Sequence, residues 1–351
     1  MYHYIMNKDI PVVRVEDKKI LNKTFCPFPF LGNSLTRYKD IIISWISKRA
    51  MPLNRKNADK IYQRLGLSRD NNAELLMYTT KGLSINDTFW IAGEKDLGKI
   101  LWKDINLYNN SFSKAVSELA FTGGTPLTIS SDDLSAEYTG QGTYTKCFIR
   151  STEGLTIYKR ESIMEIYYEE LSSCIAAILG IYSVNYKRVK LNGIDAVSSR
   201  IATNENLSWE SAFWFSTYCE EYLRSSLFDV IESNFYKQYY DMILLDGLIL
   251  NSDRHLQNWS IEYNPNTMMI YGLAPNYDFN RAFTGTIKTM SPFISGKNLL
   301  SAARIAEERL GYDLITKLIP LANRLPINMQ DTFINRVYYI SGLKNNQNNC
   351  Y

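Results

Sequence analysis

The most informative stretch of this chain reads Asn251-Ser252-Asp253-Arg254-His255-Leu256-Gln257-Asn258. After two short apolar runs it is followed by Leu273-Ala274-Pro275-Asn276-Tyr277-Asp278. Together they contain an Asp, an Asn five residues later, and a second Asp further along the chain. A carboxylate that orients a hydroxyl, and oxygen ligands for Mg²⁺, are the groups that phosphoryl transfer from ATP requires. The two stretches therefore predict a phosphotransferase.

Each of the three side chains has a predicted role. Asp253, with an ordinary pKa of about 3.9, is ionised at neutral pH and can accept the proton of an attacking hydroxyl. Asn258 can offer its amide oxygen to Mg²⁺ without adding charge beside that base. The apolar runs 259–263 and 268–271, around Asn264-Pro265-Asn266, predict a hairpin that returns Asp278 towards Asn258. Asp278 would then bridge Mg²⁺ to the β- and γ-phosphates.

His255 is one of only two histidines in the chain. A histidine in such a loop is a tempting general base. Because Asp253 is already placed to accept the proton, we prefer a packing or hydrogen-bonding role for His255 that fixes the loop.

A candidate phosphate grip lies upstream, in Thr139-Gly140-Gln141-Gly142-Thr143-Tyr144-Thr145-Lys146. Gly140 and Gly142, with Thr143, let backbone N–H groups approach a phosphate without an intervening Cβ. The Walker pattern is absent, which disfavours a P-loop NTPase. Lys159, at the end of the β-rich run 155–158, is the predicted ligand of the α- and β-phosphates.

The helix that follows Lys159 offers carboxylates as its ion-pair partner. Glu165 and Glu169 are four residues apart and share one helix face, so either can pair with Lys159. The spacing alone does not choose between them.

Composition limits the class of protein. Hydrophobic residues make up 45% and charged residues 21% of 351 residues, as in ordinary globular chains, and the net charge is +3. This balance predicts no membrane partner, and a nucleic-acid partner only indirectly if at all. The five cysteines form no Cys-x-x-Cys pair, and no export signal or apolar span is apparent. We therefore expect free thiols and a cytoplasmic protein.

The pattern along the chain divides it into regions. Residues 1–130 form a mixed accessory region, 131–204 a β-rich lobe, 205–343 a helical lobe, and 344–351 an Asn-rich tail expected to be disordered. The strongest hairpin signal is Asn192-Gly193. The predicted strands are 11–15, 143–149, 155–159, 182–189 and 194–201. The predicted helices are 37–49, 57–65, 162–179, 208–223, 235–250, 296–310, 312–322 and 328–340.

The two blocks Asn-x-Asp-Arg-His-x-x-Asn and Ala-Pro-x-Tyr-Asp resemble the signature of HipA-like kinases, the toxin kinases of bacterial toxin–antitoxin modules and their relatives. The similarity covers about 135–340. The resemblance implies an α+β, protein-kinase-like fold of two lobes: a small β-rich nucleotide lobe and a larger helical C-terminal lobe, here with an extra N-terminal region. It implies that ATP and Mg²⁺ are used, with Asp253 as the base, Asn258 and Asp278 as metal ligands, and Lys159 paired with Glu169.

The resemblance also implies regulation and partners. In that family the Gly-rich loop carries a serine whose autophosphorylation ejects the loop; Thr139 stands at this place, so it is the candidate for autophosphorylation. The implied acceptor is a Ser or Thr of a protein, in the toxin case a translation component, and an antitoxin is the implied partner. Two alternatives stay open: a small-molecule kinase, and a non-catalytic scaffold or DNA-binding regulator acting through residues 37–68.

Overall fold

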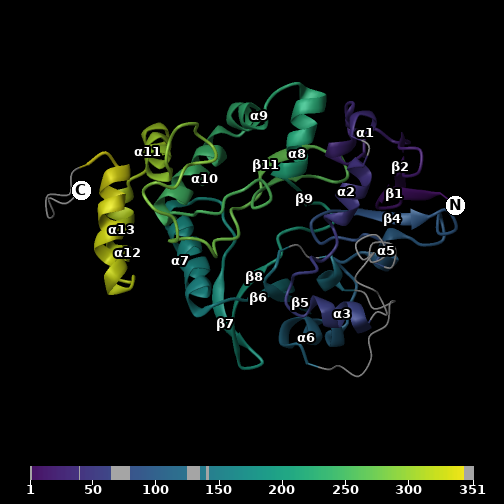
Figure 1. Ribbon diagram of the computed structural model, residues 1–351, viewed down its shortest axis with the longest axis horizontal. Helices are drawn as coiled ribbons and strands as arrows, with labels where there is room; N and C mark the ends of the chain where they lie inside the picture. Colours follow the sequence, from purple (N-terminus) through teal and green to yellow (C-terminus); the bar gives the residue numbers. More distant parts are fainter. Residues whose placement is uncertain (1, 39, 65–79, 125–134, 140–141, 344–351) are drawn as a thin grey trace. The chain divides into compact units, whose positions relative to one another are not determined.

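The computed structural model describes residues 2–38, 40–64, 80–124, 135–139 and 142–343. It divides into two compact units, and Figure 1 labels their helices and strands. Unit 1 comprises Met1–Glu161, Val189–Ser225 and Ile261–Tyr271, and unit 2 comprises Ser162–Arg188, Ser226–Ser260 and Gly272–Tyr351. The predicted division near 130 and 204 stays a prediction. Gly140, the segment after residue 64 and the predicted tail lie outside the described residues.

The first sheet of unit 1 has the order β3-β2-β1-β4. Its strands are β1 (His3–Asn7), β2 (Ile10–Arg14), β3 (Lys19–Ile20) and β4 (Phe89–Gly93). Ile5 of β1 pairs with Val13 and Ile91 in antiparallel register, and all three side chains are buried. The short helices of this region are η1 (Phe28–Phe30), α1 (Ser34–Arg37), α2 (Ile41–Ser47), α3 (Ala58–Arg64) and α5 (Trp102–Ile105).

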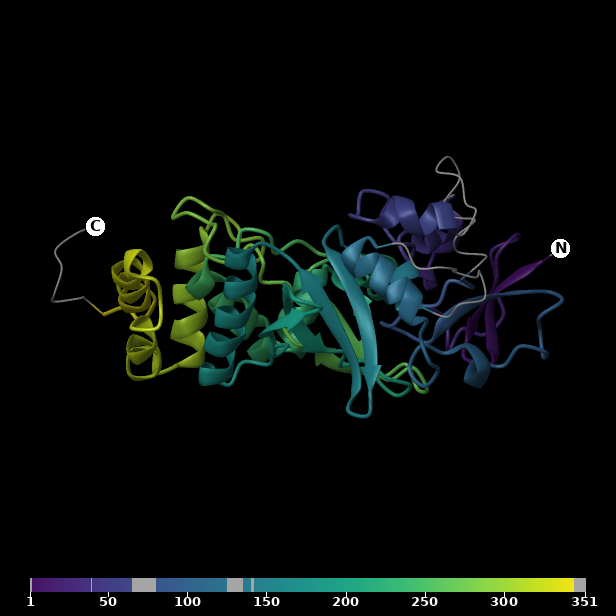
Figure 2. The same cartoon turned by 90° about the horizontal axis from the view of Figure 1, so that it is seen from below.

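The second sheet has the order β5-β6-β8-β7, and its strands can be followed in teal in Figure 2. They are β5 (Thr145–Ser151), β6 (Gly154–Arg160), β7 (Lys187–Leu191) and β8 (Ile194–Arg200), accompanied by α6 (Lys114–Thr122) and η3 (Ala136–Tyr138). Asn192 and Gly193 both have positive φ, 51° and 76°, which is the backbone that a type I′ hairpin requires. The hairpin predicted at Asn192-Gly193 is confirmed, but β7 begins at Lys187 rather than at residue 182.

A third sheet, with the order β11-β10-β9, corrects one prediction. Residues 208–223 were expected to be one helix, but they begin as strand β9 (Ser208–Ser211) and continue as α8 (Ala212–Tyr218) and the π-helical turn η4 (Cys219–Leu223). Burial alternates along β9 with the period of a strand, and pairing with β10 (Ser260–Tyr263) overrides the helical pattern. β11 (Ile270–Leu273) completes the predicted hairpin with β10.

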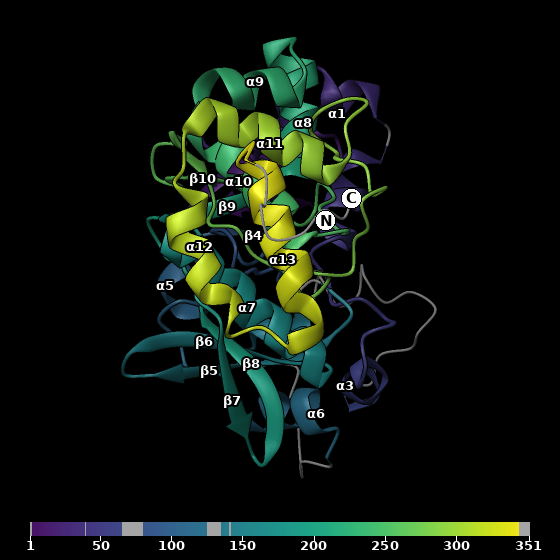
Figure 3. The same ribbon diagram turned by 90° about the vertical axis from the view of Figure 1, so that its left-hand side faces the viewer.

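Unit 2 is mainly helical, with α7 (Ile163–Leu179), α9 (Leu227–Asn234), α10 (Tyr236–Ile249), α11 (Leu299–Leu310), α12 (Leu314–Ala322) and α13 (Ile327–Ile340). Figure 3 shows α12 and α13 side by side. Gly247 permits the close packing of α10 on α11, because a Cβ there would lie 2.2 Å from the Cβ of Ala303. Every residue of α10 from Tyr239 to its end is buried, so its polar members need internal partners.

The content of small antiparallel sheets and separate helices is that of the predicted α+β class. Cys26, Cys147, Cys174 and Cys219 are free thiols as predicted, whereas Cys350 lies outside the described residues. Among the residues that the structure describes, no helix is both long and apolar enough to cross a membrane.

Candidate active site

The candidate site in unit 2 is built on a buried ion pair between Asp246 and Arg254. Asp246 lies near the end of α10 and is 1% exposed, and Arg254 is 4% exposed. The guanidinium donates from Nε to Oδ2 of Asp246 at 3.0 Å and from Nη2 to Oδ1 at 2.9 Å. Burial by itself lowers the pKa of Arg254, but the charge of Asp246 and its hydrogen bonds raise that pKa above the usual value. The guanidinium is therefore a fixed, charged donor in the interior.

The remaining arm of Arg254 connects two segments of the chain. Its Nη1 donates to the carbonyl oxygen of Asn258 at 2.6 Å and to that of Tyr277 at 3.0 Å. One segment thus holds the predicted metal ligand Asn258, and the other leads directly into the predicted metal ligand Asp278. A single buried side chain fixes the backbone at both places.

Asp253 and Asn258 meet as the sequence predicts. Nδ2 of Asn258 donates to the carbonyl oxygen of Asp253 at 2.7 Å and to its Oδ2 at 3.3 Å. Asn258 is 8% exposed, while Asp253 is exposed at the surface of unit 2. Since the amide nitrogen is directed at Asp253, the amide oxygen of Asn258 is the atom that can serve a cation.

The loop between these residues is ordered by its own hydrogen bonds. The backbone N of Asp253 donates to Oδ1 of Asn251 at 3.2 Å. Nδ1 of His255 accepts from the backbone N of Gln257 at 3.1 Å. The predicted hydrogen-bonding role of His255 is confirmed, and its exposed ring does not pack in a core.

Asp278 occupies a turn that is held on both sides. Its φ of 62° lies in the left-handed region, which Asp adopts more readily than most residues. Its backbone N donates to Oη of Tyr186 at 3.2 Å, and the next backbone N, that of Phe279, donates to Oε2 of Glu169 at 2.9 Å. With Arg254 on the carbonyl of Tyr277, three side chains hold three consecutive residues of this turn.

The predicted partners of Lys159 lie at different places on α7. Glu165 forms a capping box with Ser162: its carboxylate accepts from the backbone N of Ser162 at 2.9 Å. Glu169 is fully buried and accepts from Phe279. Lys159 itself, 8% exposed on β6, has its Nζ 3.8 Å from Oε1 of Glu161. The pairing of Lys159 with Glu165 or Glu169 stays a prediction.

The predicted phosphate grip in unit 1 contains a second lysine. Lys146 of β5 lies directly opposite Lys159 of β6, so both side chains leave the same face of the sheet, and both are 8% exposed. Gly142 has φ 84°, and a Cβ on it would lie 2.9 Å from Nζ of Lys146. Two buried lysines thus lie side by side on one face of the sheet, and one of them, Lys146, lies against Gly142.

Other residues of this predicted loop differ in exposure. Thr143 is exposed, as a residue facing a ligand or solvent would be. Thr139 is 5% exposed, and its hydroxyl is buried with no hydrogen-bond partner among the described residues. Gly140, as noted, is not among those residues.

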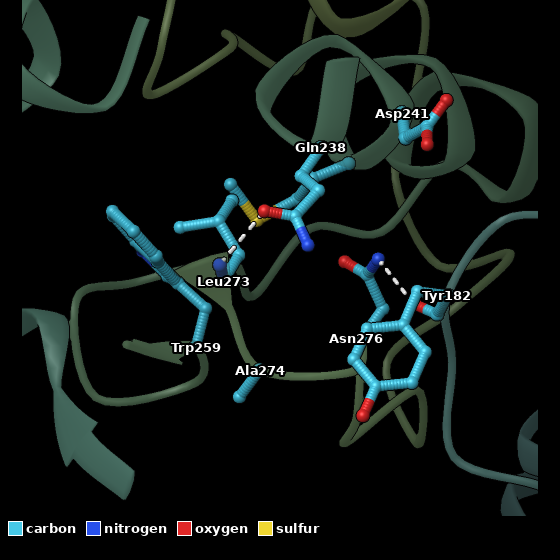
Figure 4. Close-up of a pocket in the computed structure, with 8 residues that line it drawn as sticks. Tyr182, Gln238, Asp241, Trp259, Leu273, Ala274 and Asn276 are labelled. Carbon is cyan, nitrogen blue, oxygen red and sulfur yellow. Dashed lines mark hydrogen bonds between the residues drawn. The ribbon is translucent and has the colours of Figure 1, made fainter. Parts of the chain in front are cut away.

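A small cavity lies behind the turn, against α10 (Figure 4). Its volume of about 10 Å³ is enough for one water and far too small for a substrate. Oε1 of Gln238 accepts from the backbone N of Leu273 at 3.0 Å, and Nδ2 of Asn276 donates to the carbonyl of Tyr182 at 3.0 Å. These side chains support the chain that leads to Asp278.

Sequence reasoning did not assign roles to Arg254, Tyr186 or Lys146. A signal for the first was present: Asp246 interrupts the apolar run of a helix, and a carboxylate buried among apolar residues implies a charged partner nearby. For Tyr186 the chain contained no such signal.

No family model matches this chain, and no curated protein matches it. Solved structures do. The Helicobacter pylori proinflammatory kinase CtkA is similar at 12% identity and a TM-score of 0.43, covering 56% of this chain and 90% of that one. HipA of Shewanella oneidensis MR-1, in a complex with HipB and operator DNA, is similar at 15% identity and a TM-score of 0.46, covering 86% and 84%.

Proposed function

We propose that this protein is an ATP- and Mg²⁺-dependent phosphotransferase of the HipA-like type. The observation that supports this most directly is that the buried Arg254 side chain, called the Arg254 hub, donates to the backbone carbonyls of Asn258 and Tyr277. Tyr277 precedes Asp278, and the side chain of Asn258 donates to Asp253. A base and two oxygen ligands supported by one buried framework are what positional catalysis of phosphoryl transfer requires.

The donor set fits Mg²⁺. The carboxylate of Asp278 and the amide oxygen of Asn258 are hard oxygen ligands, and Mg²⁺ is usually bound by one or two such groups together with water and substrate phosphates. When bound, the ion would neutralise charge on the β- and γ-phosphates. Among the described residues no group of three or more His, Cys, Asp or Glu side chains gathers that could hold a metal ion.

The proposed step is a displacement at the γ-phosphorus. Asp253 orients an acceptor hydroxyl and takes its proton, while the hydroxyl oxygen forms a bond to the phosphorus. The bond from the γ-phosphorus to the bridging oxygen breaks, and ADP leaves with that electron pair. The exposure of Asp253 is compatible with a hydroxyl on a macromolecule.

The nucleotide's phosphates would be held in part by Lys159, and Gly142 and Thr143 would let the backbone approach them. Lys146, opposite Lys159, would add positive charge at the same face. The acceptor that we propose is a Ser or Thr of a protein, with a translation component and an antitoxin partner as the toxin-type case. Thr139 remains the proposed autophosphorylation site, and because it is buried, Thr139 must become exposed before it can react.

The decisive experiment uses labelled ATP, the full chain and a cell lysate. Asp253→Ala should lower transfer of the γ-phosphate by about 10²–10⁴-fold, because the general base is lost, while ATP affinity changes little. Asp331→Ala, which removes an exposed carboxylate from α13, is the matched control and should transfer normally.

Three outcomes contradict parts of this proposal. Full transfer by Asp253→Ala removes the assignment of the base. Label found only on a small molecule favours the alternative acceptor class. A wild-type protein that binds ATP but labels nothing, and shifts DNA in a salt-dependent manner, favours the regulator.

A further inference from the structure

A short segment between α7 and β7 is attached directly to the turn that carries Asp278. The backbone N of Asn276 donates to the carbonyl of Tyr182 at 2.9 Å, and the backbone N of Val184 donates to the carbonyl of Asn276 at 2.9 Å. This two-bond contact, a parallel bridge centred on Ser183 and Asn276, fixes where the next residues of the segment lie.

Tyr186 ends this segment and faces the turn. It is 4% exposed, and its ring packs edge-on against Phe279, with centroids 6.0 Å apart and an interplanar angle of 80°. Its backbone N donates to Oγ of Ser173 on α7 at 3.3 Å. The ring therefore has little freedom, and its hydroxyl accepts from the backbone N of Asp278 at 3.2 Å.

The turn needs such an anchor. A non-glycine residue at positive φ is less stable than the same residue in extended or helical backbone, and it persists where its surroundings hold it. Arg254 holds the preceding carbonyl and Glu169 the following backbone N, and the bond to Tyr186 acts on the backbone of Asp278 itself.

We propose that Tyr186 is a positioning residue: its hydroxyl holds the backbone of Asp278 so that the carboxylate is aimed for metal binding. The expected effect on metal binding rests on the proposed function, whereas the hydrogen bond between Tyr186 and Asp278 can be tested independently of that function. Metal ligands that are displaced by a fraction of an ångström bind the metal more weakly. Loss of the hydrogen bond from Asp278 to Tyr186 should therefore first raise the Mg²⁺ concentration that transfer requires.

Tyr186→Phe removes the hydroxyl and keeps the ring against Phe279. The matched control is Tyr239→Phe, since Tyr239 is 3% exposed and its hydroxyl donates to the carbonyl of Phe293 at 3.1 Å, in the same unit. Amide hydrogen exchange on the full chain should show that the backbone N–H of Asp278 exchanges about 10-fold faster in Tyr186→Phe and unchanged in the control. Unchanged exchange at Asp278 overturns the anchor, whatever the activity of the protein.

The second measurement is the Mg²⁺ dependence of phosphate transfer. Tyr186→Phe should raise the Mg²⁺ concentration for half-maximal transfer by about 3–10-fold, restore most of the rate at saturating Mg²⁺, and leave metal-free nucleotide affinity unchanged. A uniformly lower rate with unaltered Mg²⁺ dependence would mean a merely structural role and overturn the inference. If the wild type transfers no phosphate, the proposed function fails and this consequence fails with it, while the exchange result still reports on the anchor.

Discussion

Each unit of the molecule contains a buried arginine paired with a buried aspartate, and the two pairs have nearly the same chemistry. In unit 1, Arg49 donates from Nη1 and Nη2 to the two carboxylate oxygens of Asp87 at 2.7 and 2.8 Å. It also donates to the backbone carbonyls of Gly82 and Phe89. In unit 2, Arg254 donates to the two carboxylate oxygens of Asp246 from Nε and Nη2, and it likewise donates to two backbone carbonyls.

The difference lies in which backbone each guanidinium holds. Arg49 holds Phe89, the first residue of β4, and stacks on Trp45 at 4.2 Å, so it joins a strand to a helix. Arg254 holds Asn258 and Tyr277, which are a predicted metal ligand and the neighbour of another. A buried ion pair therefore does not indicate function by itself. Its role depends on which residues have backbone carbonyls that the arginine binds.

The largest expected effect comes from breaking the pair in unit 2. Arg254→Met leaves Asp246 buried without its cation and should destabilise the protein by about 3–5 kcal/mol. Because the carbonyls of Asn258 and Tyr277 lose their donor, phosphate transfer per folded molecule should fall by about 10²-fold or more. Chemical denaturation and kcat/KM for the labelled substrate measure the two effects.

A milder substitution keeps the test informative if Arg254→Met does not fold. Arg254→Lys keeps the charge but not the fork, so it can reach Asp246 and cannot hold both carbonyls. It should fold and still transfer at least about 10-fold more slowly than the wild type. Wild-type kcat/KM in a folded Arg254→Lys would show that the hub does not position the site.

The next effect tests the same substitution in unit 1. Arg49→Met should also destabilise by about 3–5 kcal/mol, because Asp87 is left buried and unpaired. Transfer per folded molecule should stay within about 2-fold of the wild type, since Arg49 contacts none of the proposed catalytic groups. A loss of kcat comparable with that of Arg254→Met would contradict the view that Arg254 positions the catalytic residues and Arg49 does not.

Much of the fold was predictable because local signals were strong. The capping box at Ser162, the glycine that ends α7, and Asn192-Gly193 each determine backbone through one or two side chains. Residues 208–211 were not predictable in this way. They resemble a helix by composition, and their strand conformation depends on pairing with β10, far away in the sequence.

The candidate site, whose catalytic and metal-binding roles stay proposals, was predictable where chemistry requires particular residue types at fixed spacing, as for Asp253, Asn258 and Asp278. Its support was not. Tyr186 reaches Asp278 only because the folded chain brings together segments 92 residues apart, and no local pattern encodes that contact. Glu169, whose pairing with Lys159 stays a prediction, also accepts a hydrogen bond from the backbone N of Phe279, and no local pattern predicts that contact.

The smallest expected effect concerns pH and belongs to the pair in unit 1. Glu210 is 8% exposed, and burial, followed by the nearby charge of Asp87, raises its pKa to about 8, against the opposing effect of Arg49. The folded chain therefore binds a proton more tightly than the unfolded chain, in which this carboxyl titrates near its ordinary value of about 4.3. Its contribution to stability is complete below the unfolded pKa and is lost as pH rises towards about 8.

Glu210→Gln removes this titration and keeps an amide of similar shape. From pH 6 to 8 the wild type should lose up to about 3 kcal/mol of unfolding free energy relative to the variant, at about 1.4 kcal/mol per pH unit. Above pH 8 the difference should become flat. Urea denaturation at several pH values measures this difference in unfolding free energy. A difference that does not change with pH would show that Glu210 is not the group with the raised pKa. Arg254→Lys leaves Glu210 and the groups that shift its pKa, Asp87 and Arg49, unchanged, so the same titration repeated on Arg254→Lys should retain the full slope of the wild type.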